Sequence, residues 1–366
     1  MENNSRQYAG LDVLKFVCSI LVIMIHFFNV SGNDFSDTLN FCVIEYFTRV
    51  SVPVFFVISS FLILRKALIK KDDNKGYDID HKYVLKKCFN YFRLYLIWTF
   101  IYLFFIIKSV LHGRKTVLLI IRDFFFTGSY LHLWYLPSII VGILIVTFLV
   151  KKGLSFNSIL ILAFIFYIIG LSGHTYYGLT NELRKIEIFQ KIYDWYFKIF
   201  YTTRNGLFEG FIFCAVGLKI AEKENNRLSE NNNSHINNLI FLAGFVISLI
   251  IVIFEANYVR DNRLYRETDF YLFTVLECYF LVRLFININI SESKLTNAFR
   301  AMSSIIYFIH MFIGNGLSSV LGLLKIQNSD TIDLFLPTLV LSVILSFVLY
   351  KISNIDRFKV LKKLYS

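Results

Sequence analysis

The sequence is poor in proline and in paired cysteine. Only three prolines occur in 366 residues, so long apolar stretches can continue as unbroken helices. The five cysteines are scattered and form no Cys-x-x-Cys pair, which argues against a disulfide framework and against a zinc site. We therefore expect long helices and no bound metal.

Charge is also scarce. Charged residues make up 17% of the chain and hydrophobic residues 56%, whereas a soluble domain has about 25% charged and 45–50% apolar residues. The mean hydropathy is +0.58. A single buried core would not absorb 40 phenylalanines and 22 tyrosines. This composition excludes an ordinary soluble domain and makes the lipid bilayer the first expected partner.

Long apolar runs recur along the whole chain. Since a spanning helix needs about 20 mostly apolar residues, we predict ten spans, at about 11–31, 42–64, 89–111, 132–150, 156–173, 205–221, 237–256, 269–289, 299–325 and 334–350. The first is too long, and lacks the small-residue cleavage site, for a removable signal peptide. The apolar stretch 117–127 is short and carries Arg122 and Asp123, which indicates an interfacial or re-entrant piece.

Basic residues are distributed unevenly between the loops. With ten spans both termini share one side, and that side holds 20 Lys and Arg against 11 on the other. The positive-inside rule then places both termini in the cytoplasm. The same rule, with attraction to anionic lipid headgroups, accounts for the net charge of +12 without a nucleic-acid partner. The sequence predicts an all-α, polytopic transmembrane helical bundle, one domain over 1–366 with no soluble domain appended.

Polar residues line one face of the first predicted helix. Asp12, Lys15, Ser19 and His26 lie within about 60° of one another at 100° per residue, in an otherwise apolar span. Ionisable groups inside a bilayer are costly and usually functional. The helix could line an interior passage, with Asp12 near the cytoplasm and His26 in the outer half. Alternatively, Asp12 and Lys15 are interfacial caps, and His26 bonds a neighbouring helix.

A second histidine lies on a similar face. Ser303, Tyr307, His310 and Gly314 are spaced as neighbours on one side of a helix. Serine and tyrosine in spans often simply bond across helices. Both histidines are candidate site residues, with Tyr307 as a candidate neighbour.

Four further charged residues lie at the ends of spans. Glu45 and Arg49 are one turn apart and could pair with each other. Arg204 and Glu209 flank the start of the sixth span. We expect these four residues to serve substrate binding or structure.

Three cations lie at the cytoplasmic end of the third span. Lys86 and Lys87 open it, and Arg93 lies a turn or more inside the apolar run. A guanidinium in that place suits bidentate phosphate binding. The lysines could instead be part of the topology signal alone.

Five blocks of sequence, in order, resemble acyltransferase family 3, a group of integral membrane acyltransferases of bacterial envelopes. They are YAGLDVLKFVCSILVIMIHFF with Asp12 and His26, RVSVPVFFVISSFLI with Arg49, LHLWYLPSIIVG with Trp134, TRNGLFEGFIFCAVG ending at Gly217, and SSIIYFIHMFI with His310. The resemblance covers most of the chain and implies ten helices in the cell membrane.

The resemblance implies a reaction. Acyl-coenzyme A, usually acetyl-CoA, would bind from the cytoplasm near Arg93, Lys86 and Lys87, and the acyl group would pass to a hydroxyl of an envelope carbohydrate. His26 matches the family's catalytic histidine, acting as base or as acyl carrier. A pKa near 6.5 suits a histidine to act as a base near neutrality.

Two positions depart from the family pattern. Asn90 replaces the first arginine of the family's Arg-x-x-Arg pair, so only Arg93 matches. Ser60 replaces the glycine that usually follows Ser59, which predicts the loss of a close-packing position.

The block TRNGLFEGF also resembles the membrane domain of the membrane-bound serine racemases of vancomycin resistance. That resemblance implies amino-acid uptake, with a soluble racemase domain following the membrane domain. The second hypothesis is therefore a transporter, which needs no acyl donor, and coenzyme A binding separates the two.

Overall fold

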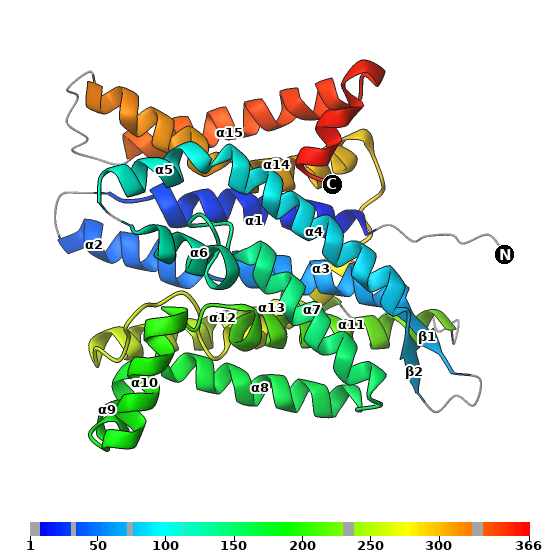
Figure 1. Ribbon diagram of the computed structural model, residues 1–366. Coiled ribbons are helices and arrows are strands. Elements are labelled where there is room, and N and C mark those ends of the chain that lie inside the picture. Colours follow the sequence, from blue (N-terminus) through cyan, green and yellow to red (C-terminus); the bar gives the residue numbers. More distant parts are fainter. Residues whose placement is uncertain (1–7, 31–33, 72–75, 114, 230–237, 324–331) are drawn as a thin grey trace. The chain divides into compact units, whose positions relative to one another are not determined.

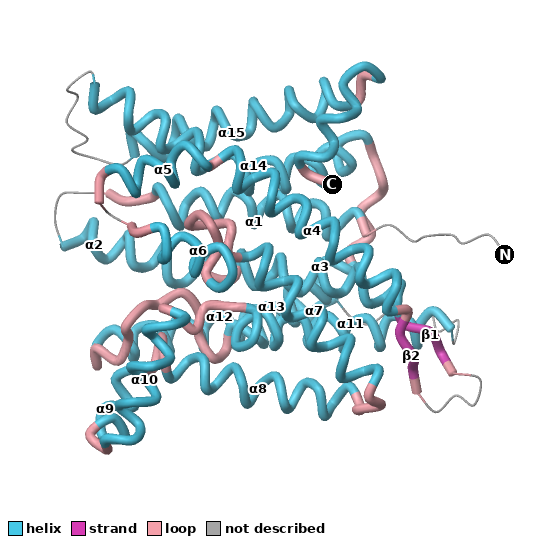
Figure 2. The backbone as a smooth tube through the Cα atoms, viewed as in Figure 1, coloured by secondary structure: helices cyan, strands magenta, loops and turns pink. Residues whose placement is uncertain are grey.

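The computed structural model describes residues 8–30, 34–71, 76–113, 115–229, 238–323 and 332–366. Most of this part of the chain is helical (Figure 2), which confirms the predicted all-α class. Its strands are β1 (Leu68–Lys70) and β2 (Tyr77–Ile79), an antiparallel pair with Leu68 opposite Ile79. This hairpin lies between the second and third predicted spans, where no strand was predicted.

The α-helices are labelled in Figure 1 in chain order. Their bounds are α1 (Ala9–Phe27), α2 (Asp34–Phe41), α3 (Ser51–Ala67), α4 (His81–Ile101), α5 (Leu103–Leu111), α6 (Val117–Phe126), α7 (Tyr135–Lys151), α8 (Phe156–Ser172), α9 (Asn181–Arg184), α10 (Glu187–Phe200), α11 (Phe211–Ser229), α12 (Asn238–Asp261), α13 (Thr274–Asn287), α14 (Lys294–Leu323) and α15 (Ile332–Ser353). Two π-helical turns, η1 (Cys42–Thr48) and η3 (Gly206–Gly210), lead into α3 and α11, and η2 (Tyr177–Thr180) and η4 (Asp356–Leu364) are 3₁₀ helices.

Helix starts are set by local capping side chains. The side chain of Asp80 accepts a hydrogen bond from Tyr83 N at the start of α4, and Ser155 accepts one from Ser158 N at the start of α8. Thr116 caps α6 in the same way. Each cap satisfies a backbone N–H that the first helical turn leaves unpaired. Because of the Asp80 cap, α4 begins eight residues before the predicted span, and Lys86 and Lys87 lie inside the helix.

A helix lies in each of the ten predicted spans. In the described residues, five segments are long and apolar enough to cross a membrane by themselves, or seven if each of two bent helix pairs counts as one span. Helices α13, with 14 residues, and α7, with 17, are shorter than the usual spanning length. The chain is therefore a multi-pass membrane protein, while the count of ten and the orientation stay predictions.

The third predicted span, 89–111, is not one straight helix. It breaks at Tyr102, and α4 and α5 meet at an angle of 52°. The Tyr102 ring is fully buried and stacks on Tyr130 at 4.5 Å between centroids. The break in the span thus coincides with a ring contact to a later segment of the chain.

The chain divides into two compact units that interleave along the sequence. The first comprises residues 1–55, 235–245 and 280–366. In it α1 packs along α14, and α14 along α15, as Figure 1 shows in blue, orange and red. At Gly10 a Cβ would lie 2.2 Å from the carbonyl oxygen of Phe285, so only glycine permits this close approach of α1 to the end of α13.

The second unit comprises residues 56–234 and 246–279. Its core is formed by α7, α8, α11 and η3, with α4 against α7. The Oγ of Ser60 donates to Phe56 O at 2.8 Å, and a Cβ at Gly217 would lie only 2.0 Å from that Oγ. The expected loss of close packing at Ser60 is therefore wrong, because Gly217 of α11 supplies the missing space from the opposite side.

Candidate functional site

The two candidate histidines lie together. The rings of His26 on α1 and His310 on α14 are stacked, 5.4 Å apart at an interplanar angle of 29°. His26 is exposed, whereas His310 is fully buried. An accessible imidazole thus lies against a second imidazole that belongs to the protein interior.

A glycine and two aromatic rings hold this pair. The Phe27 ring meets His310 edge-on at 6.4 Å, and a Cβ at Gly314 would lie 2.1 Å from Phe27 Cζ. Glycine at 314 therefore lets the end of α1 approach α14. The Tyr307 ring lies 6.3 Å from that of His310 and 5.6 Å from that of Phe55. Three residues of the predicted face, Tyr307, His310 and Gly314, therefore lie together beside the end of α1.

The buried histidine has a defined proton position. Its Nδ1 lies 3.1 Å from the carbonyl oxygen of Ile306, one turn back on α14. A carbonyl only accepts, so the neutral ring must carry its proton on Nδ1, and Nε2 is the basic nitrogen. Ser303, also on the predicted face, donates instead to Arg300 O at 3.1 Å.

Asp12 lies far from the histidine pair. It is separated from His26 by fourteen residues, about 21 Å along α1 at 1.5 Å per residue. Its carboxylate is buried and accepts from Arg300 of α14 at 2.7 and 2.9 Å, with Lys15 Nζ at 3.3 Å. Of the three residues predicted as catalytic, the structure joins His26 and His310 and leaves Asp12 as an ion-pair anchor between α1 and α14.

The three predicted coenzyme-binding cations all lie on α4. Lys86 is exposed and Arg93 half-buried. They are seven residues apart and so share one face of the helix. Lys87 lies on another face, with its Nζ 5.4 Å from the centre of the Tyr83 ring. The arrangement keeps positive charge along the first half of α4.

Glu45 and Arg49 form the ion pair that their spacing allowed. Arg49 donates from Nη2 to Oε1 at 2.8 Å and from Nε to Oε2 at 3.1 Å, and Glu45 is buried. Bidentate pairs of this kind are the stronger and more directional ones. The charges of the two side chains are thus largely matched within η1 and the turn that follows it.

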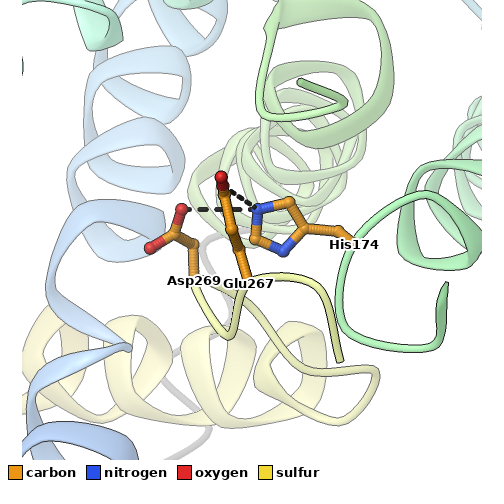
Figure 3. A group of neighbouring side chains, drawn as sticks. All are labelled: His174, Glu267 and Asp269. Atoms are coloured by element: carbon orange, nitrogen blue, oxygen red, sulfur yellow. Dashed lines mark hydrogen bonds and ion pairs between the residues drawn. The ribbon is translucent and has the colours of Figure 1, made fainter. Parts of the chain in front are cut away.

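The second unit brings Trp134 and Arg204 together in a cluster that the sequence did not predict. The Arg204 guanidinium lies 5.1 Å from the Trp134 ring centre and donates to Asp269 Oδ2 at 2.6 Å. His174 Nε2 lies 3.0 Å from Glu267 Oε2 and 3.4 Å from Asp269 Oδ2, and Figure 3 shows both carboxylates converging on the imidazole. Glu209, the other residue that flanks the start of the predicted sixth span, lies buried in η3.

This cluster shifts two pKa values. Burial by itself lowers the pKa of His174, but hydrogen bonds to Asp269 and Glu267 outweigh it and raise the pKa above 6.5. The hydrogen bond to His174 lowers the pKa of Glu267 below 4.5, against the effect of burial. The two shifts agree in describing an imidazolium bound by two carboxylates.

The same three side chains have the spacing of a metal site. Their ligand atoms lie within 4.8 Å of one another, and one histidine with two carboxylates is a known donor set. However, Arg204 is bonded to the same Asp269 oxygen that faces His174. A guanidinium at 2.6 Å repels a divalent ion, so the cluster is better described as a network of two cations and two anions.

A family model described as "Acyltransferase domain" matches residues 8–351. The chain belongs to acyltransferase family 3. No solved structure matches it.

Three curated relatives of this acyltransferase-family chain are named racemases. Two are amino-acid racemases of Enterococcus faecalis, 31% identical over 62% of this chain and 25% identical over 69%. The third is a serine/alanine racemase of Enterococcus gallinarum, 26% identical over 74% of this chain. The chain spans 30%, 34% and 36% of the length of these relatives.

Four residues of these ion pairs and networks were not predicted from the sequence. Arg300 was absent from the candidates because its partner, Asp12, lies at the other end of the chain. His174, Glu267 and Asp269 were missed because they lie in connecting segments outside the polar stripes of the helices. A usable signal was present, since predicted outer loops carry His174 and Glu267, and Asp269 starts the adjoining span.

Proposed function

We propose that this chain transfers an acyl group, with acetyl as the first candidate, from cytoplasmic acyl-CoA to a hydroxyl of a carbohydrate of the bacterial cell envelope. Membership of the acyltransferase family supports acyl transfer. The carrying observation is the exposed imidazole of His26 stacked on the buried imidazole of His310. An accessible base with a fixed neighbour is what removal of a hydroxyl proton requires.

His26 has the reacting role in this proposal. As a base, it takes the proton from the acceptor hydroxyl and delivers it to the departing sulfur, while the acyl–oxygen bond forms and the acyl–sulfur bond breaks. As a carrier, its nitrogen holds the acyl group between the two transfers. In both cases His310 and Phe27 orient the imidazole ring of His26. The ion pair of Asp12 and Arg300 holds α1 against α14.

The cations on α4 suit the phosphates of the donor. The donor, when bound, supplies the acyl group as a thioester. Lys86 and Arg93 share a face of α4, and ammonium and guanidinium groups bind phosphate by charge-assisted hydrogen bonds. Arg93 is half-buried in the helix, so it offers a more directional contact than the exposed Lys86.

The decisive experiment compares His26→Ala with the unchanged protein in cells, reading acceptor acylation by mass spectrometry. Loss of a general base costs about a hundred- to ten-thousand-fold in rate, so acylation should fall below detection. Acetyl-CoA binding should persist. His112→Ala, which changes an exposed histidine at the end of α5, serves as the matched control. Full acylation by the His26→Ala strain would overturn the assignment.

Donor binding is tested separately with purified protein. Arg93→Ala should weaken acetyl-CoA binding and reduce its salt dependence, whereas Lys359→Ala, an equal loss of charge in the exposed η4 segment, should leave both unchanged. If the Arg93→Ala protein and its parent bound acetyl-CoA with equal affinity, Arg93 would not be part of the donor site.

Amino-acid uptake is the second candidate, because the curated relatives are racemases. The Arg204, Asp269, His174 and Glu267 network offers positive and negative groups to a zwitterion. Uptake of labelled L-serine into proteoliposomes, against protein-free liposomes, measures this activity. Uptake without acetyl-CoA binding would favour the transporter, and binding without uptake would favour the acyltransferase.

A further inference from the structure

Helix α10 (Glu187–Phe200) is the most strongly amphipathic long helix of the second unit, and its residues fall into three stripes. The first stripe is aromatic and half-buried, with Tyr193, Tyr196, Phe197 and Phe200. The second is apolar and exposed, with Ile188, Ile192 and Trp195. The third is charged and exposed, with Glu187, Lys191, Asp194 and Lys198.

The three stripes are set by the spacing of the residues. At 100° per residue, positions 188, 192 and 195 lie within about 60° of one another. The charged positions are centred about 100° to one side, and the aromatic positions about 120° to the other. A helix in water beside a protein needs only two faces, apolar inward and polar outward, so the exposed apolar stripe needs its own partner.

The aromatic stripe is fixed to the protein. The ring of Tyr196 stacks on that of Phe200 at 4.8 Å, and Phe200 meets Phe126 of α6 at 5.0 Å. The Arg266 guanidinium lies 4.1 Å from the centre of the Phe197 ring. These contacts determine which way the other two stripes face.

The charged stripe behaves as a surface in water. Lys191 Nζ and Glu187 Oε1 pair at 2.5 Å with both side chains largely exposed. Gln190 donates to Asp194 at 2.8 Å in the same setting. Charges of both signs alternate along this stripe, so it needs hydration and gains little from burial against another protein.

We propose that α10 lies in the plane of the membrane interface, with Ile188, Ile192 and Trp195 inserted at the boundary of headgroups and acyl chains. Its 14 residues span about 21 Å at 1.5 Å per residue, less than the roughly 30 Å hydrocarbon core. An interfacial helix has an apolar side in lipid and a charged side in water. Tryptophan is enriched at that depth, and the protein itself supplies the third side.

The neighbouring helix supports a lipid partner over a second copy of the chain. Helix α6, with ten residues, contacts α10 and also exposes an apolar stripe of Val117, Leu118, Ile121 and Phe125. It carries Arg122 and Asp123 beside that stripe, paired at 2.7 Å. Two short amphipathic helices in contact, both too short to span, match the boundary of one bilayer.

Tryptophan fluorescence gives a direct test, because Trp195 is 62% exposed while Trp98 and Trp134 are 4% and 6% exposed. The full chain is reconstituted in phosphatidylcholine nanodiscs that contain brominated lipid, with bromine near the headgroup end or near the chain terminus. Bromine near the headgroup end should quench the accessible emission most. Trp195→Phe should lose that quenchable fraction. Quenching by aqueous iodide and not by brominated lipid would overturn the proposal.

A pair of cysteine variants gives a second test that does not depend on Trp195. Lys191→Cys and Ile192→Cys change adjacent exposed residues that belong to different stripes. In nanodiscs, with both bilayer faces open to a charged maleimide, Lys191→Cys should react and Ile192→Cys should not. The unchanged chain gives the background of the five native cysteines.

Each result of the cysteine test bears on the proposal. Equal reaction at both positions would show that both stripes face water and would overturn it. Protection of Ile192→Cys that disappears on dilution to one protein per nanodisc would assign the stripe to a second copy and would also overturn it. Protection that persists on dilution supports the lipid partner.

Discussion

Arg300 donates from Nε and from Nη2 to the same oxygen, Oδ2, of Asp12, at 2.9 and 2.7 Å. The other carboxylate oxygen lies 3.3 Å from Lys15 Nζ. Two cations therefore share one buried carboxylate, and the pair ties the first helix of the chain to α14, 288 positions away. Because α1 and α14 also carry His26 and His310, this ion pair helps to fix the position of one histidine against the other.

Asp12→Asn should lower the thermal unfolding midpoint of the purified protein. The substitution removes the negative charge and leaves Lys15 and Arg300 facing each other, at a cost of about 1–3 kcal/mol. The cost stays below that of a fully buried pair because the Arg300 side chain is 42% exposed. Arg300→Lys keeps the positive charge and loses the paired N–H donors of the guanidinium. Its unfolding midpoint should lie between those of the parent protein and Asp12→Asn. An unchanged midpoint for Asp12→Asn would contradict this account.

His310→Ala should reduce acyl transfer without abolishing it. The ring is fully buried, and its Nδ1 is bound to its own helix, so it positions His26 and does not meet the acceptor. Misplacement of a reacting group costs up to about a hundredfold, mainly in kcat. Tyr307→Phe, which keeps the ring beside His310, is the milder companion. If His310→Ala loses all transfer while still binding both substrates, its role is chemical and the prediction is wrong.

Gly217→Ala should destabilise the protein, whereas Ser60→Gly should be tolerated. A Cβ at 217 meets Ser60 Oγ at 2.0 Å, and also Phe61 N and Val57 O at 2.9 Å. Overpacking of this kind costs about 1–3 kcal/mol. The backbone contacts remain when Ser60 is changed, so Ser60→Gly should not rescue Gly217→Ala. Rescue in the double variant would show that the hydroxyl alone sets the limit.

Stability should depend on pH through His174. The folded-state pKa of His174 is raised, so its stabilisation is complete below pH 6.5 and is lost as the pH rises through the folded value. The folded-state pKa of Glu267 is lowered, so its stabilisation is complete above pH 4.5 and is lost as the pH falls. The contribution of the pair is therefore greatest between these limits.

The measurement for that pair is the unfolding midpoint across pH in one detergent. His174→Asn should flatten the alkaline side of the profile and Glu267→Gln the acidic side. A profile with the same alkaline slope in the His174→Asn protein would assign the slope to another group.

Much of the fold could be predicted because lipid imposes a simple rule. Backbone groups in a bilayer must bond internally, so each long apolar run has to be a helix, and each predicted span contains one. The exact lengths could not be predicted. The break between α4 and α5 falls at Tyr102, whose ring stacks on Tyr130 of a later loop, and no local pattern signals that contact.

The candidate site was predictable where it lies on one helix face. The spacing around His26 and around His310 marked both stripes, and the structure then brought the two together. Helical spacing relates only residues of one helix, so it could not predict partners that come from distant segments. Asp269, 65 positions from Arg204, shares no helix with it, and no local pattern pairs them.

The two π-helical turns have a consequence for the evolution of this chain. A turn bonded from residue i to i+5 holds one residue more than an α-turn would, so η1 and η3 each amount to an accommodated insertion. Deleting one residue within η1 would rewind the turn and rotate α2, which runs directly into it, by about 100° relative to the residues after the turn. Natural gains and losses of a single residue in η1 would therefore change which side chains α2 presents, while the length of the helix hardly changed.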